Sequence, residues 1–266
     1  MHTKFKLILS SLIALILLIV APLGFKADAS SLPAKETPIY LKMDKYYILY
    51  TRPSEPFLDQ QGRLLVPLRS IQDLMGGEVS YNHQTKTATV KLLNQTFKLT
   101  MNAKAAYVNQ KEITMDTVPV LKNGAMFLPL RLFLDNTDIE YKWRNDVNLL
   151  HITDKRVVVG EPFESFAGND FTTGYLDDAF HLSAFKVQNS SISIKAQNMT
   201  GKTVPHGKTD IQPLVQFNTG GFSVDSYTRP GNKEIPEIKI GQSFWVTKEI
   251  GIRDPAYIIA VGRKAN

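Results

Sequence analysis

Short runs in which apolar and polar residues alternate dominate the chain after residue 39, and they predict a fold rich in β-strands. Residues 39–50, IYLKMDKYYILY, predict two strands joined by a turn at Asp44-Lys45. Further alternating runs predict strands and hairpins between residues 78 and 115. From about residue 156 onward, about seven short runs separated by Gly, Pro, Asn and Ser predict an antiparallel β-sandwich.

Helical spacing replaces this alternation at two places, each just after a proline. The apolar residues at helical spacing are Leu68, Ile71, Leu74 and Met75 after Pro67, and Leu130, Phe133 and Leu134 after Pro129. Proline suits the first turn of a helix, where a missing N–H costs little. The sequence therefore predicts two short helices, the first of which ends at Gly76-Gly77.

Both predicted helices lie in a sequence repeat. RLLVPLRSIQDLMGGEVSYN, from Arg63, aligns without a gap with AMFLPLRLFLDNTDIEYKWR, from Ala125, at an offset of 62 residues. A single short amphipathic helix cannot bury its own apolar face. We therefore expect the two copies to cover each other around one sheet, so that the repeat serves the architecture.

The repeat also carries a family resemblance. Its motifs are P-x5-GR-x2-VPLR-x-I at 56–71, GGEVSYNHQTKTATV at 76–90 and NGAMFLPLR at 123–131. With these motifs, residues 39–153 resemble the copper amine oxidase N-terminal-like domain, or stalk domain, of secreted bacterial proteins. The sequence departs from that pattern at 136–138, where Leu-Gly is expected, and at Tyr81, where Trp is common. The resemblance implies an α+β stalk-like domain of antiparallel strands with two short helices.

The second half of the chain resembles a different class of domain. IKIGQSFWVTKEIGI, at 238–252, is similar to the late strands of bacterial extracellular immunoglobulin-like domains. Residues 157–266 are therefore expected to form an all-β immunoglobulin-like sandwich that follows the stalk-like domain. VVVGEP, at 157–162, is the expected seam between the two domains.

The N-terminal residues predict export. Lys4 and Lys6 precede a long apolar run, and Ala-Asp-Ala at 27–29 has the spacing of a cleavage site, so residues 1–29 read as a secretory signal peptide. A retained membrane anchor is the alternative, because the run is nearly long enough to span a bilayer. After cleavage, we expect no membrane span and an extracellular or cell-wall location.

The amino-acid composition limits which covalent links and which kinds of binding partner the chain can have. The chain has no cysteine, so it can have neither a disulfide framework nor a lipid-bearing cysteine. The net charge is +6 for the whole chain and +4 without Lys4, Lys6, Lys26 and Asp28 of residues 1–29 (28 Lys and Arg against 24 Asp and Glu). This mild excess favours anionic wall polymers or membrane surfaces. No run of basic residues concentrates this charge, so a solvated surface without a partner also explains it, and no nucleic-acid partner is expected.

The sequence lacks the residues that a copper amine oxidase needs for its chemistry. It has no tyrosine in an Asn-Tyr-Asp/Glu setting that could become the quinone, and no His-x-His pair for copper. The resemblance is to the stalk alone, which in those oxidases lies away from the chemistry. We therefore expect no oxidase activity, no catalytic or metal residues and no cofactor.

Arg69 and Arg131 are the first candidate binding residues. Each follows Pro-Leu at the start of a predicted helix, where an exposed guanidinium could hold a carboxylate or a phosphate. Alternatively, each arginine bonds to loop carbonyls or to the aspartate one turn later, Asp73 or Asp135. We favour the second interpretation, because duplicated local chemistry is what a repeat requires. On that interpretation each guanidinium is partly buried, and alanine lowers the melting temperature.

Two further groups of side chains are candidates. Tyr81 and Trp143 occupy equivalent strand positions and either form a sugar-stacking surface or pack in the core, which is our expectation. Asp177, Asp178 and His181 would lie close together on one helical turn and could form an acid–base or metal cluster. A solvated turn between strands explains this second group as well.

Taken together, the sequence predicts a secreted, non-catalytic protein of the cell envelope that serves in adhesion, spacing or ligand capture. Expected partners are anionic cell-wall polymers, peptidoglycan or another envelope protein. One alternative is an extracellular enzyme, a wall hydrolase or protease, with its site in the C-terminal half. Another is a carbohydrate-binding module, which needs several coplanar exposed aromatic side chains.

Overall fold

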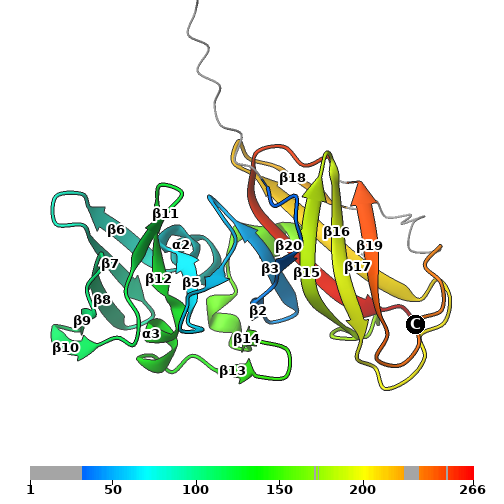
Figure 1. Cartoon of the computed structure of the whole chain (residues 1–266), viewed down its shortest axis with the longest axis horizontal. Helices are drawn as coiled ribbons and strands as arrows, with labels where there is room; N and C mark the ends of the chain where they lie inside the picture. The colour runs from blue at the N-terminus through cyan, green and yellow to red at the C-terminus, as the bar shows by residue number, and fades with distance from the viewer. Residues whose placement is uncertain (1–31, 171, 173, 225–233, 250) are drawn as a thin grey trace, which may run out of the picture. The chain divides into compact units, whose positions relative to one another are not determined.

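The computed structural model describes residues 32–266 apart from 171, 173, 225–233 and 250 (Figure 1). Leu32–Asn266 forms one compact unit. The predicted signal peptide, residues 1–29, lies outside the described residues. In the part of the chain that is described, no helix is both long and apolar enough to cross a membrane.

Strands dominate the described residues, and the helices are few and short. The helices are α2 (Leu68–Met75), α3 (Leu130–Asp135), α4 (Glu161–Gly168) and the 3-10 helix η1 (Lys155–Val157). The strands of the first half are β1 (Thr37–Pro38), β2 (Leu41–Met43), β3 (Tyr46–Thr51), β4 (Phe57–Leu58), β5 (Leu64–Pro67), β6 (Glu78–Asn82), β7 (Thr87–Leu92), β8 (Gln95–Thr100), β9 (Ala105–Val108), β10 (Lys111–Thr114), β11 (Val120–Lys122), β12 (Ala125–Pro129), β13 (Tyr141–Arg144) and β14 (Leu149–Ile152). The strands of the second half are β15 (Phe180–Gln188), β16 (Ser191–Asn198), β17 (Thr209–Phe217), β18 (Phe222–Val224), β19 (Ser243–Glu249) and β20 (Pro255–Lys264). The predicted α+β first half and β-rich second half are confirmed at this level.

The strands of the described residues form four sheets. Their orders are β13-β14-β2-β3-β20-β17-β18, β1-β15-β16-β19, β10-β9-β8-β7-β6 and β11-β12-β5-β4. The predicted hairpin at residues 39–50 is confirmed as β2 and β3, with Asp44 at positive φ in the turn. One predicted strand, PEIKI at 236–240, contributes only an isolated bridge between Ile238 and Val204.

The seven-stranded sheet lies between two hydrophobic cores. Successive side chains of a strand point to opposite faces, and all six residues of β3 are buried. Tyr47 and Leu49 face one core, which is shared with β15 and β16, while Tyr46 and Ile48 face the other core, which is shared with the helices. Figure 1 shows β15 lying over β20, and β15 also contacts β3. The C-terminal strands therefore pack on a sheet that an N-terminal hairpin completes.

The two stretches 62 residues apart meet in one antiparallel ladder. The pairs in this ladder are Leu65 with Pro129, Val66 with Leu128 and Pro67 with Phe127. Val66 and Leu128 occupy equivalent positions in the two stretches and lie directly opposite each other. A local two-fold axis therefore passes through this pair, as in an isologous contact between identical subunits.

The hairpins that follow the two helices have the same register. Tyr81 pairs with Ala88 in the first, and Trp143 pairs with Leu150 in the second, again at an offset of 62 residues. They differ in what they pair with next. The first hairpin continues into β8, β9 and β10, whereas β14 pairs in parallel with β2 of the seven-stranded sheet.

The predicted seam at 157–162 is a packed segment. It contains the start of α4, a helix that the sequence analysis missed, and Phe163 and Phe166 of α4 pack on the ring of Tyr46 at centroid distances of 5.0 and 5.3 Å. Gly160 lies so close to α2 that a Cβ atom there would be 1.8 Å from the carbonyl oxygen of Asp73. The division into domains at 39–153 and 157–266 stays a prediction, and the hydrogen-bonded sheets do not follow it.

Candidate functional site

Arg131 and Asp135 face outward from α3, because the apolar residues of this short helix occupy its buried side. The arginine side chain is 61% exposed, and its Nε atom donates to Asp135 at 3.0 Å. The hydroxyl of Tyr141, on β13, donates to the same carboxylate. The charge of Asp135 is the main cause that raises the pKa of Arg131, while burial is the main cause that raises the pKa of Tyr141.

A groove of about 500 Å³ opens beside this pair. Its lining includes Arg63, Leu64, Arg131, Tyr141, Trp143 and Leu150. We call it the Trp143 groove. The period-2 alternation of β13 places Tyr141 and Trp143 on one face of the strand, and both rings also pack against the core. The groove thus combines a rigid aromatic wall with two guanidinium groups.

The two arginines of the Trp143 groove are already held in place. Arg63, from the loop before β5, pairs with Asp116 at 2.5 Å, as Arg131 does with Asp135. Guanidinium groups present a planar fork of donors that matches a carboxylate or a phosphate, and aromatic rings offer flat apolar faces with a polar edge. This arrangement can bind a ligand that has both a flat ring and an acidic group.

A second groove, of about 480 Å³, lies at the other helix of the repeat. Its lining includes Arg52, Arg69, Asp73, Glu161, Phe217 and Tyr257. We call it the Arg69 groove. The hydroxyl of Tyr257, on β20, donates to Asp73 at 2.6 Å, and burial is the main cause that raises the pKa of this tyrosine.

The predicted environment of the two arginines is wrong in one respect and right in another. Arg69 and Arg131 are exposed instead of partly buried, and neither bonds to loop carbonyls among the described residues. The expected pairing with the aspartate one turn later is confirmed for Arg131. It does not occur for Arg69, whose equivalent aspartate receives the hydroxyl of Tyr257.

Tyr81 and Trp143 have different surroundings although they occupy equivalent positions. Both are half-buried and pack against the core, as expected. Tyr81 makes an edge contact with His83 at a centroid distance of 4.9 Å, whereas Trp143 lines a groove. The two aromatic residues therefore have equivalent positions in the repeat but different surroundings in the structure.

Asp177, Asp178 and His181 do not form the cluster that the sequence suggested. No helical turn joins them, because the aspartates lie in a turn and His181 lies in β15. Asp178 forms an ion pair with the buried Lys42 at 2.6 Å. His181 is buried against the ring of Tyr47, and its Nδ1 atom has no hydrogen-bond partner among the described residues. Over those same residues, no group of three or more His, Cys, Asp or Glu side chains is placed to hold a metal.

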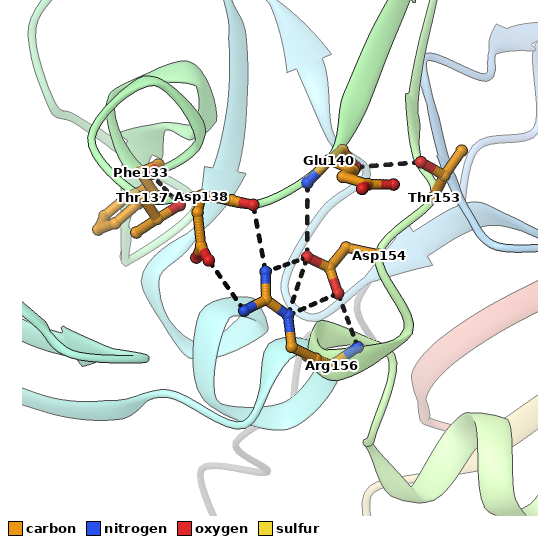
Figure 2. A network of polar contacts seen from close by, with 7 residues as sticks. All are labelled: Phe133, Thr137, Asp138, Glu140, Thr153, Asp154 and Arg156. Atoms are coloured by element: carbon orange, nitrogen blue, oxygen red, sulfur yellow. Dashed lines mark hydrogen bonds and ion pairs between the residues drawn. The ribbon is translucent and has the colours of Figure 1, made fainter.

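A polar network that the sequence analysis did not identify ties the segment after α3 to the end of β14 (Figure 2). The Arg156 guanidinium donates to the Asp154 carboxylate at 2.6 Å and to that of Asp138 at 3.0 Å. Asp154 also accepts the backbone N–H of Arg156. The hydrogen bonds from Arg156 hold the pKa of Asp154 at about 2, well below its usual range. This network holds in place the segment that leads into residues 157–162.

A second unpredicted network surrounds Arg263 of β20, which is 2% exposed. Its guanidinium reaches Asp210 at 2.7 Å, Asp170 at 2.6 Å and Gln212 at 2.7 Å. Because every one of these partners is itself largely buried, the network is structural and offers no open position to a ligand. A charge this deeply buried is retained only with such pairing.

Comparison with known families agrees with the resemblance seen in the sequence. Residues 44–152 match the family model of the copper amine oxidase N-terminal domain. This region is therefore similar to the copper amine oxidase N-terminal domain. That domain is non-catalytic in those oxidases, and both hairpins of the repeat and the Trp143 groove fall within the matched residues. The match spans less than half of the chain. A comparison of the whole chain with curated proteins gives no match.

Proposed function

We propose that this protein is a secreted, non-catalytic protein of the cell envelope that captures an acidic glycan in the Trp143 groove. The predicted signal peptide supports export, and the positive net charge that remains without residues 1–29 favours anionic wall polymers. The sheets around the C-terminal core, which β1 and β3 complete, would serve as the spacer that carries the binding groove.

The observation that carries this proposal is the composition of the Trp143 groove. A sugar ring can stack on Trp143 or Tyr141, and an acidic substituent can bond to the forks of Arg63 and Arg131. About 500 Å³ is within the range of small-ligand sites. Binding is favoured over catalysis because neither a nucleophile with an adjacent base nor a metal cluster lines this groove.

For the alternative of a hydrolase or protease with a C-terminal site, Asp177, Asp178 and His181 were the candidate residues. Since these side chains do not converge, no residue set in the described part of the chain favours that alternative. The alternative of a carbohydrate-binding module merges with the present proposal, with the site on the N-terminal domain.

Replacing Trp143 or Arg131 with alanine is expected to weaken binding of an acidic oligosaccharide about tenfold, which corresponds to about 1.4 kcal/mol. Affinity is lost because Trp143→Ala removes the aromatic face on which the sugar ring stacks, and Arg131→Ala removes a guanidinium group that bonds to the acidic substituent. Isothermal titration calorimetry with an oligogalacturonate trimer measures it, and a neutral oligosaccharide of equal length is expected to bind more weakly.

Lys142→Ala is the matched control, because Lys142 is an exposed cation on the same strand and does not line the groove. The melting temperature of Arg131→Ala is expected to change little, since an exposed i,i+4 ion pair is worth about 0.3–0.5 kcal/mol. Unchanged affinity in both groove variants would contradict the proposal. A large drop in the melting temperature would instead support the structural role first expected for Arg131.

A further inference from the structure

The two grooves share a set of groups that the repeat alone does not explain. At each, an arginine and an aspartate four residues apart lie on a helix of the repeat, and a tyrosine hydroxyl donates to that aspartate. Asp73 lines the Arg69 groove, whereas Asp135 lies outside the lining of the Trp143 groove. The helix residues are related by the offset of 62. The tyrosines are not, because Tyr141 comes from β13 and Tyr257 comes from β20. Two unrelated segments thus supply the same group at equivalent places.

The resemblance extends to the rest of each lining. A second arginine comes from a loop, Arg63 in the Trp143 groove and Arg52 in the Arg69 groove. A second aromatic ring is also present, Trp143 in the former and Phe217 in the latter. The two volumes, about 500 and 480 Å³, are close to each other.

Within the part of the chain that the structure describes, the arginines of the Arg69 groove differ from those of the Trp143 groove in having no counter-ion. Among the described residues, the guanidinium groups of Arg52 and Arg69 make neither a hydrogen bond nor an ion pair, and both side chains are exposed. Asp73 is occupied by Tyr257, and Glu161, at the start of α4, is the other acidic residue of the lining. An acidic group of a ligand can therefore bind at Arg52 and Arg69 without displacing an internal partner.

We infer that the Arg69 groove is a second binding site for the same class of ligand, an acidic glycan, so that each protein molecule is bivalent. This inference rests on the function proposed for the Trp143 groove. One chain of a polymer, or two neighbouring chains, can then engage both grooves of one molecule. Two linked sites raise the apparent affinity for a polymer far above that of either site, by an effective-concentration effect.

Stoichiometry with short and long probes tests the inference on the whole protein. An oligogalacturonate trimer is expected to bind at two sites in the wild type and at one site after Trp143→Ala. The double variant Arg52→Ala with Arg69→Ala is expected to retain only the site at Trp143. The combination of Trp143→Ala and Arg131→Ala with Arg52→Ala and Arg69→Ala should abolish binding. Arg253→Ala, which removes an exposed cation elsewhere, should keep both sites.

Long polymer gives an independent readout. Wild type is expected to bind polygalacturonate at least a hundredfold more tightly than the trimer and to cross-link it, which increases turbidity, whereas either single-groove variant should do neither. The same experiment with poly(glycerol phosphate) distinguishes recognition of carboxylates from recognition of phosphodiesters. Binding of either polymer at two sites supports bivalency.

Each outcome separates the two proposals. One site in the wild type, lost with Trp143→Ala and unaffected by the Arg52 and Arg69 changes, would overturn the second site and leave the proposed function intact. Two sites that persist after Trp143→Ala and Arg131→Ala would overturn the function proposed for the Trp143 groove. Absence of binding of both acidic probes to the wild type would overturn both.

Discussion

His181 makes stability depend on pH. Its side chain is 4% exposed, and burial is the main cause that lowers its pKa from 6.5 to about 4, with a further contribution from the charge of Arg144. In the unfolded chain the pKa returns to about 6.5. Between pH 6.5 and 4 the unfolded chain therefore binds a proton that the folded chain does not, and stability falls as the pH falls. A shift of roughly 2.5 units corresponds to about 3 kcal/mol at most.

We expect the free energy of unfolding of the wild type to fall more between pH 7 and 4.5 than that of His181→Leu, because leucine cannot take up the proton. Urea denaturation at the two pH values measures both differences. His206→Gln is the control, since His206 is exposed and its removal should leave the pH dependence unchanged. Equal pH dependence in the wild type and His181→Leu would show that the imidazole titrates normally in the folded protein.

At the scale of single residues, sequence reasoning identified the grooves only in part. The offset of 62 drew attention to Arg69 and Arg131, and both line grooves. The hydrogen-bond partners around each arginine could not be predicted from the sequence, because Tyr257, which bonds to Asp73, lies 184 residues away along the chain. Arg263 was missed for the same reason. A charged residue at the end of an apolar strand looks exposed until its partners on other segments are known.

At the scale of elements, α4 is the helix that the sequence pattern did not predict. Gly160 and Pro162 were taken as the signs of a seam, yet proline in the first turn also begins a helix. The two buried phenylalanines, Phe163 and Phe166, are spaced at i and i+3. These are only two apolar positions, against the four at helical spacing in α2, so the spacing does not stand out. The helices α2 and α3 were predicted because apolar residues recur at helical spacing after Pro67 and Pro129.

Gly160→Ala is expected to destabilise the protein by on the order of 1–3 kcal/mol, the cost typical of forced overpacking. The added methyl group would lie 1.8 Å from the backbone oxygen of Asp73, so α2 and α4 would have to separate. Thermal or urea unfolding measures the loss. The matched control is Gly168→Ala, since an added Cβ at Gly168 meets nothing within 4 Å. Similar stabilities for the two variants would mean that α4 is not held against α2.

At the scale of the whole molecule, the alternating runs predicted most strands but not their partners. Alternation shows which face of a strand is buried, and it does not show which strand lies beside it. The runs after residue 156 were therefore assigned to a sandwich of their own. In the structure, β1 pairs with β15 and β3 pairs with β20, so N-terminal strands complete both sheets around the C-terminal core.

A fragment of residues 157–266 is expected not to fold alone, contrary to a division of the chain into two independent domains. Without β3, the ladder of β20 loses a partner, and both cores lose side chains such as Ile48, Leu49 and Tyr50, which are at most 2% exposed. Each such side chain contributes about 1.5–3 kcal/mol, and a domain has only about 5–15 kcal/mol in total. Near-ultraviolet circular dichroism and urea unfolding of the fragment test this, with co-expression of residues 32–153 as the control that should restore a folded complex. Cooperative unfolding of the fragment by itself would establish the two-domain division and show that the hairpin of β2 and β3 is dispensable to the C-terminal strands.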